Sequence, residues 1–143
     1  MKIEQQQLIE WQLAKLNTSF AHHLDRAEYE PLIAVFAPDG LFVRHGTPLR
    51  GHDEIRKAMS ERLPMTTRHL VTNTHFYDMT EDTAKAVLYT LVQAGPPRRD
   101  GRPLVYQARQ VTLMEFHNEY VRTTDGWRIA RLENLPVFVP EDQ

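Results

Sequence analysis

Residues 67–73 have the sequence Thr67-Arg68-His69-Leu70-Val71-Thr72-Asn73, which lies in the first of four long runs of strand-forming residues. The runs are rich in Val, Thr, Tyr, Leu and Phe and extend over Arg68 to Tyr77, Ala84 to Ala94, Leu104 to Tyr120 and Trp127 to Leu135. β-Branched and aromatic side chains favour the extended backbone of a strand. Short segments of turn-forming residues separate the runs, so we expect each strand to pair antiparallel with the next.

The part of the chain before these strands predicts a long helix. Residues 4–24 contain no Pro or Gly, and apolar side chains recur at helical spacing at Ile9, Leu13, Leu16, Phe20 and Leu24. This periodicity is typical of an amphipathic helix. A second stripe of mostly small or aromatic residues lies nearly opposite the first, so both stripes can be buried. The second stripe contains Trp11, Ala14, Thr18, Ala21 and Asp25.

Three shorter elements are expected between the long helix and the four strands. The segment Asp25-Arg26-Ala27-Glu28 has the pattern of a capping box and predicts a helix that continues to Val35 and stops at a turn over residues 37–40. Residues 41–44 predict a short strand, and residues 46–51 predict a loop. A third helix is expected from about Asp53 until Pro64 ends it. The predicted order is two helices, a strand, a helix and four strands.

Composition restricts the class of protein. A chain of 143 residues can form one core, and we expect a single domain over residues 1–135 and a tail over residues 136–143. The net charge of −2 gives no broad field for nucleic acid or an anionic membrane, so neither is expected as a partner. The absence of Cys excludes disulfides and thiol chemistry. No segment has the apolar core of a signal peptide or the roughly 20 apolar residues of a membrane span, so a cytoplasmic location is expected.

The element order and three segments resemble the SnoaL-like branch of the nuclear transport factor 2-like superfamily. The segments are Phe36-Ala37-Pro38-Asp39-Gly40, the strand Arg68-His69-Leu70-Val71-Thr72-Asn73 and the closing Asp125-Gly126-Trp127-Arg128-Ile129. The resemblance covers nearly the whole chain. It implies a cone-shaped α+β fold in which a curved antiparallel sheet wraps round the first helix and leaves a pocket at its open end. Within the superfamily, the chain is most similar to scytalone dehydratase, bile-acid dehydratase and hexachlorocyclohexane dehydrochlorinase.

Two residues match the catalytic positions of those cofactor-free lyases. His69 corresponds to their histidine base in the first long strand, and Asp25 corresponds to their aspartate at the end of the first helix. A carboxylate that fixes the tautomer of an imidazole makes a proton-transfer pair near neutral pH. Each residue also has a structural interpretation: His69 as a core histidine bonded to a backbone carbonyl, and Asp25 as the N-cap of the second helix.

Five further residues are candidates for contact with a substrate. Asn73 lies four residues after the candidate base, so strand alternation places both side chains on one face, although a cross-strand hydrogen bond is an alternative role for Asn73. Tyr89 and His117 are polar residues in otherwise apolar strands, and exposure at a strand end is the alternative for His117. Arg44 stands where scytalone dehydratase has a tyrosine. Trp11 belongs to the second stripe of the long helix.

The resemblance implies a cofactor-independent lyase of the dehydratase type, or an isomerase, that acts on a small apolar cyclic molecule. No metal site is expected, because the histidines lack a ligand spacing such as His-Glu-x-x-His. The alternative is a non-catalytic ligand-binding or assembly module that resembles the small subunit of ring-hydroxylating dioxygenases. Contact between His69 and Asp25 at a closed pocket would favour catalysis. Because this fold leaves one face of its sheet uncovered, we also expect a homodimer, with a trimer as the alternative.

Overall fold

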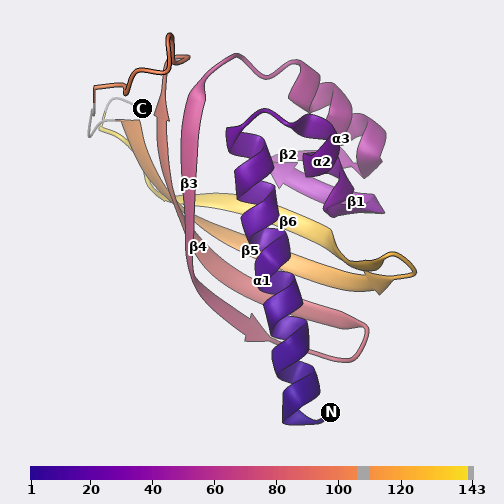
Figure 1. The fold of residues 1–143 in the computed structure, drawn as a ribbon. Helices are drawn as coiled ribbons and strands as arrows, with labels where there is room; N and C mark the ends of the chain where they lie inside the picture. The colour runs from indigo at the N-terminus through magenta and orange to yellow at the C-terminus, as the bar shows by residue number, and fades with distance from the viewer. Residues whose placement is uncertain (106–109, 142–143) are drawn as a thin grey trace.

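The structure, a computed structural model, describes residues 1–105 and 110–141. A long N-terminal helix packs across one face of a six-stranded sheet, and the two shorter helices lie beside the C-terminal end of the long helix (Figure 1). This arrangement confirms the predicted α+β class. The elements are α1 (Ile3–Asp25), α2 (Tyr29–Ala34), β1 (Phe36–Arg44), β2 (Thr47–Arg50), α3 (Gly51–Ser60), β3 (Thr66–Tyr77), β4 (Thr83–Gly95), β5 (Val111–Thr123) and β6 (Gly126–Phe138).

The strands are arranged in the order β2-β1-β6-β5-β4-β3. The predicted antiparallel pairing of successive long strands is confirmed for β3 with β4, β4 with β5, and β5 with β6. However, β1 pairs parallel with β6, so the sheet is mixed and the expectation of an antiparallel sheet was wrong at this position. Three hairpin connections set the direction of β6 relative to β3. Among the described elements, no hairpin joins β1 to β6, so their relative direction depends on the packing of the elements between them. Local sequence patterns do not show which distant strands become neighbours.

Several element boundaries differ from the sequence predictions. The expected loop over residues 46–51 contains β2, which forms a hairpin with β1 through His45 and Gly46. Both of these residues have positive φ, as the tightest hairpin turns require. The expected turn over residues 37–40 is an irregularity within β1, where the pairing with β6 shifts register between Phe36 and Leu41. Helix α3 begins at Gly51, two residues before the expected start.

Three predictions near element ends also need correction. Asp25 is the last residue of α1 and does not cap α2, whose N-cap is Glu28 without a side-chain cap hydrogen bond. Strand β5 begins at Val111, and residues 106–109 of the longer predicted strand lie outside the described residues. Strand β6 continues to Phe138, so the first part of the expected tail over residues 136–143 is paired with β5, and residues 142–143 lie outside the described residues.

The core lies between α1 and the sheet. The apolar stripe of α1 is buried there, and the ring of Phe20 meets the rings of Phe36, Phe42 and Phe116 edge to face, with centroids 5.7–6.1 Å apart. The second stripe of α1 was expected to allow burial as well, but it faces solvent over most of its length. Trp11 is 59% exposed, and the Lys15 ammonium lies over its ring. One sheet can cover only one side of a helix, and no other described element packs on the outer side of α1.

A buried polar cluster connects α1 to β5 within this core. The Tyr120 hydroxyl donates to Asn17 Oδ1 over 2.6 Å, and Asn118 Nδ2 lies 3.2 Å from the same oxygen. Burial raises the pKa of Tyr120 to about 12, despite hydrogen bonds with both asparagines that act in the opposite direction. Such a cluster fixes the rotation and the position of the helix on the sheet, because a displacement would separate buried polar groups from their hydrogen-bond partners.

Gly40 lies at the irregularity in β1, and we predict that a side chain there destabilises the fold. An added Cβ would lie 2.9 Å from Ala37 O and 3.0 Å from Ile129 O, and neither backbone oxygen can move without disturbing the β1–β6 pairing. Gly40→Ala is therefore expected to lower the free energy of unfolding by about 1–3 kcal/mol in denaturant titration. The control is Asp39→Ala at the exposed neighbouring position, where a change within about 0.5 kcal/mol is expected. Equal stability of the two variants would contradict this prediction.

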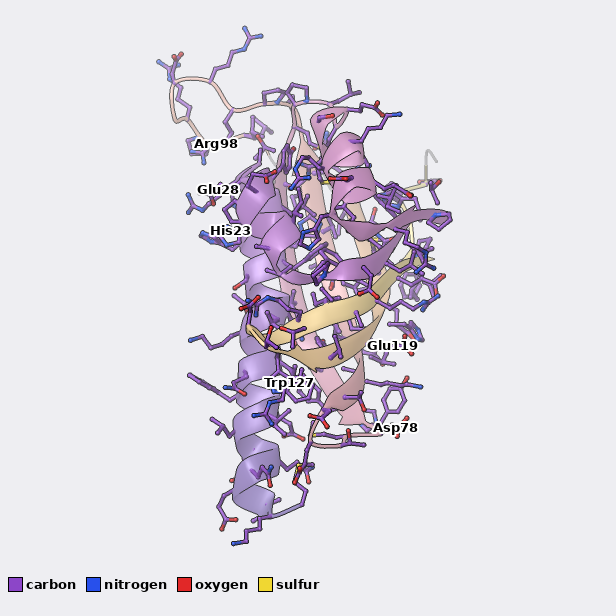
Figure 2. All side chains as sticks on the ribbon, turned by 90° about the vertical axis from the view of Figure 1, so that its right-hand side faces the viewer. His23, Glu28, Asp78, Arg98, Glu119 and Trp127 are labelled. Carbon is purple, nitrogen blue, oxygen red and sulfur yellow. The ribbon has the colours of Figure 1, made fainter. Side chains whose placement is uncertain are left out.

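The face of the sheet away from α1 has an apolar end and a charged end. Directly paired residues form an apolar row across four strands at one end: Leu70, Leu91, Leu113 and Phe138. Phe138 is 67% exposed and Leu70 is 54% exposed. The other end carries the paired row Lys85, Glu119 and Arg131, and Figure 2 shows Glu119 on the side of the sheet opposite α1.

We propose that a second copy of the chain covers this apolar row, because paired side chains of four strands form a continuous exposed patch. Light scattering at micromolar concentration should then give about twice the 16.7 kDa mass of the chain. Leu91→Asp, in the middle of the row, should shift the protein to monomer. Val87→Asp, on the same strand and face beside His117, is the control and should leave the mass unchanged. A wild-type protein that is strictly monomeric would exclude the proposal.

Candidate active site

Asp25 and His69 are brought together where the end of α1 meets the beginning of β3. The ring Nδ1 of His69 lies 2.5 Å from Asp25 Oδ1, and the His69 backbone N–H donates to Asp25 Oδ2 over 2.9 Å. The Thr67 hydroxyl also donates to Oδ1, over 2.9 Å. The side chains of Asp25 and His69 are each only 10% exposed. Three donors from one strand therefore hold the carboxylate in a fixed position.

These hydrogen bonds determine which nitrogen of His69 carries the proton. Burial raises the pKa of Asp25, but the hydrogen bonds and charge of His69 together with the Thr67 hydrogen bond outweigh it, so the pKa of this carboxyl lies below its usual value. An ionised carboxylate only accepts hydrogen bonds, so Nδ1 must be the donor. In the neutral ring, the lone pair is then on Nε2. Within the part of the chain that the structure describes, Nε2 has no hydrogen-bond partner, so it can accept a proton from another molecule.

His69 faces a cavity of about 340 Å³ between α1 and the sheet. This volume is at the lower end of the range for small-molecule sites. Most of the wall is apolar and comes from Phe20, Leu24, Phe42, Met65, Val92, Ala94, Met114, Phe116, Pro136 and Val139. The polar side chains in the wall are Arg44, His45, Arg62, Thr67, His69, Thr112 and Asn134. The cavity can therefore enclose a small apolar molecule and present a few polar groups to it.

Arginine and histidine supply the titratable groups of this wall. Burial lowers the pKa of Arg44, and the nearby charge of Arg62 lowers it further. Burial and the charge of Arg44 likewise lower the pKa of His45. Arg62 donates from Nη1 to Tyr29 Oη over 3.2 Å, with longer contacts of 3.4 Å to Leu24 O and the Thr67 hydroxyl. Among residues 1–105 and 110–141, no carboxylate belongs to the cavity wall.

Asn134 also presents a polar group to the cavity. Its Oδ1 accepts the backbone N–H of His45 over 2.9 Å, and a backbone N–H can only donate, so the orientation of the amide is fixed. The Nδ2 group forms no hydrogen bond within the described part of the chain and is available as a donor. Sequence reasoning missed both Asn134 and Arg62. Neither residue belongs to a local motif, and Arg62 lies 38 positions after Leu24, whose backbone it contacts.

Of the five residues proposed for substrate contact, the structure places Arg44 in the cavity wall and the other four outside it. Trp11 is on the outer side of α1. Tyr89 and His117 are on the sheet face away from α1, where His117 Nε2 bonds Glu115 Oε1 over 2.9 Å. The expectation for Asn73 failed because β3 contains an irregularity between Thr72 and His75. Asn73 has a φ of 53° there, which interrupts the alternation, and its side chain is exposed.

Two other features of the surface carry polar side chains that could bind a ligand. His22, His23 and Glu28 place potential metal-ligating atoms within 4.8 Å of one another, and Figure 2 shows His23 and Glu28 on the outer surface at the end of α1. This cluster is outside the cavity. A hollow of about 290 Å³ at the beginning of β3 and the end of β4 shares Thr67 and Ala94 with the cavity and is otherwise lined by Arg68, Arg98 and a mixture of polar and apolar residues. It has no histidine or carboxylate among its described wall residues, so it lacks a group suited to proton transfer near neutral pH.

The fold and the family are shown by comparison with known proteins. The sequence profile of the SnoaL-like domain family matches residues 6–133, so the chain belongs to that family. This confirms the predicted SnoaL-like resemblance. Among curated proteins, none matches this chain. No helix of the described residues is sufficiently long and apolar to cross a membrane.

Solved structures share this fold at low sequence identity. A protein of Novosphingobium aromaticivorans assigned as an aromatic ring hydroxylase is 24% identical, with a TM-score of 0.74, over 96% of this chain and 92% of that chain. A protein of the same organism assigned as a scytalone dehydratase is 16% identical, with a TM-score of 0.79, over 96% and 89% of the two chains. A type 2 hexachlorocyclohexane dehydrochlorinase, LinA, is 16% identical, with a TM-score of 0.77, over 96% and 90%.

Proposed function

We propose that the chain is a cofactor-independent lyase or isomerase that uses His69 as its general base. The observation that carries the proposal is the hydrogen bond between His69 Nδ1 and Asp25 Oδ1 at the wall of a mostly apolar cavity. A non-catalytic binding or assembly module needs a pocket or a surface, but it does not need a carboxylate that fixes the tautomer of a pocket histidine. The names of two neighbours, a dehydratase and a dehydrochlorinase, support elimination chemistry.

The proposed reaction begins with proton transfer to His69. Nε2 takes a proton from the carbon next to a substrate carbonyl, and the electron pair of that C–H bond moves to form an enolate. In a lyase, the enolate re-forms the carbonyl, a double bond forms between the deprotonated carbon and the next carbon, and the hydroxyl on that next carbon takes the proton from the His69 imidazolium and leaves as water. In an isomerase, the proton returns to a different carbon. Asp25 stabilises the imidazolium during the step.

The developing negative charge on the enolate oxygen requires a donor. Asn134 Nδ2 is suitable, because the backbone N–H of His45 fixes the amide and leaves this NH₂ group available. A fixed donor stabilises the charge that appears in the transition state without having to reorient. The cavity volume of about 340 Å³ and its aromatic wall support a small apolar cyclic substrate, with the enolisable carbonyl as its polar group.

The test is an absorbance screen of hydroxylated and unsaturated cyclic ketones, in which loss or shift of a conjugated double bond reports the reaction. Wild-type protein should convert at least one compound, and the doubly substituted Asp25→Asn, His69→Ala protein is the blank. Conversion that persists in the doubly substituted protein would reject His69 as the base. Stoichiometric binding of these ketones without conversion would favour a binding module.

A further inference from the structure

The charge of the cavity wall is opposite in sign to the net charge of the protein. The chain as a whole contains 19 acidic and 17 basic residues, but the titratable side chains of the cavity wall are Arg44, His45, Arg62 and His69 within the part of the chain that the structure describes. The carboxylate of Asp25 is behind His69 and already accepts three hydrogen bonds. The wall is therefore electropositive, although the net charge of the protein is −2.

Neither Arg44 nor Arg62 forms an ion pair within residues 1–105 and 110–141. Arg62 contacts only neutral oxygens, and Arg44 has no hydrogen bond to a described side chain. In contrast, the surface residue Arg56 binds both Glu30 and Asp53 at 2.9 Å. A partly buried guanidinium loses hydration, and neutral oxygens compensate for that loss less well than a carboxylate does. The two positive charges also repel each other, which lowers the pKa of Arg44.

We propose that Arg44 and Arg62 form a carboxylate-binding subsite in the His69 cavity, so that the substrate is a small apolar molecule that carries a carboxylate. The proposal deepens the function proposed above and rests on it for the reaction, but not for the binding. Guanidinium groups bind carboxylates through paired N–H donors, with stronger hydrogen bonds than neutral partners form.

Charge balance favours a monoanion over a dianion such as a phosphate monoester. The two guanidinium charges and the single negative charge of Asp25 leave one positive charge uncompensated in and behind the wall. A carboxylate neutralises this charge, whereas a dianion would leave one negative charge in a mostly apolar cavity. A bound carboxylate also orients the rest of the molecule, so that the acidic C–H bond can be held at His69 Nε2 in one geometry.

The test compares two probes of nearly equal shape by isothermal titration calorimetry: 1-naphthoate, which is anionic, and 1-naphthamide, which is neutral. Wild-type protein should bind 1-naphthoate at least about ten-fold more tightly than 1-naphthamide, because a charge-assisted hydrogen bond replaces a neutral one. Arg44→Gln and Arg62→Gln should each remove most of this preference while leaving the affinity for 1-naphthamide nearly unchanged. Arg56→Gln, which removes a surface arginine outside the cavity, is the matched control and should retain the full preference.

Two further measurements make the outcome decisive. His69→Ala should keep the preference for 1-naphthoate, so the subsite can be present even if the protein proves to have no lyase activity. Arg62 bonds three protein oxygens and its loss can affect folding, so melting curves of each variant are required. If Arg62→Gln does not fold, Arg44→Gln decides the result, because Arg44 has no hydrogen bond to lose among the described side chains. Equal affinity of wild-type protein for both probes, or an undiminished preference in Arg44→Gln, would overturn the proposal.

Discussion

His69→Ala is expected to lower turnover on a confirmed substrate by about 10²–10⁴-fold, because the group that accepts the proton is removed. The fold should survive, since the side chain borders a cavity and its removal uncovers little apolar area. The measurement is kcat by absorbance, together with thermal melting. The matched control is His75→Ala, which removes an exposed histidine from the same strand and should change kcat less than two-fold.

The pH dependence tests the same role independently. The activity of the wild-type protein should have an acid limb, because an imidazolium has no lone pair with which to accept the substrate proton. This acid limb should be absent from any residual activity of His69→Ala. A His69→Ala protein that retains nearly full turnover would eliminate the proposed mechanism and favour the binding module.

Asp25→Asn is expected to lower turnover by at least about 10²-fold, because it reverses the tautomer of His69. The carboxylate accepts both the His69 backbone N–H and the ring Nδ1–H. An amide has one oxygen, and the fixed backbone N–H must face it, so the NH₂ group of the amide faces Nδ1. The neutral ring then accepts at Nδ1 and carries its proton on Nε2, the atom that must accept the substrate proton.

The ¹⁵N chemical shifts of the His69 ring distinguish this tautomer change from simple misfolding. They should exchange their assignment between wild-type protein and Asp25→Asn, whereas Asp125→Asn in the exposed β5–β6 turn should change neither the shifts nor kcat. Because Asp25 acts as a positioning residue through His69, the doubly substituted protein should be scarcely slower than His69→Ala alone. Strictly multiplicative losses would indicate that Asp25 acts separately from His69.

The long-range contacts explain which sequence predictions failed. Strand alternation placed Asn73 on the face of His69, but the irregularity after Thr72 interrupts that alternation. The capping-box pattern assigned Asp25 to the start of α2, whereas β3 supplies three donors to the Asp25 carboxylate. Both patterns are local. The alternation is interrupted in the pairing of β3 with β4, and the carboxylate of Asp25 finds its donors only when α1 and β3 meet.

Local sequence patterns were sufficient to predict the long first helix and the antiparallel order of the four long strands, since periodicity and turn residues act over a few neighbouring positions. The element order and three short segments indicated the family. The family resemblance also led to the pair Asp25 and His69. Only the tertiary structure placed Arg44 and Arg62 in one cavity, at the end of β1 and just after α3. A guanidinium on the surface does not indicate a binding site. It indicates one where burial removes its hydration and no carboxylate of the protein pairs with it. Burial and pairing depend on how distant elements pack, so they cannot be derived from spacing along the chain.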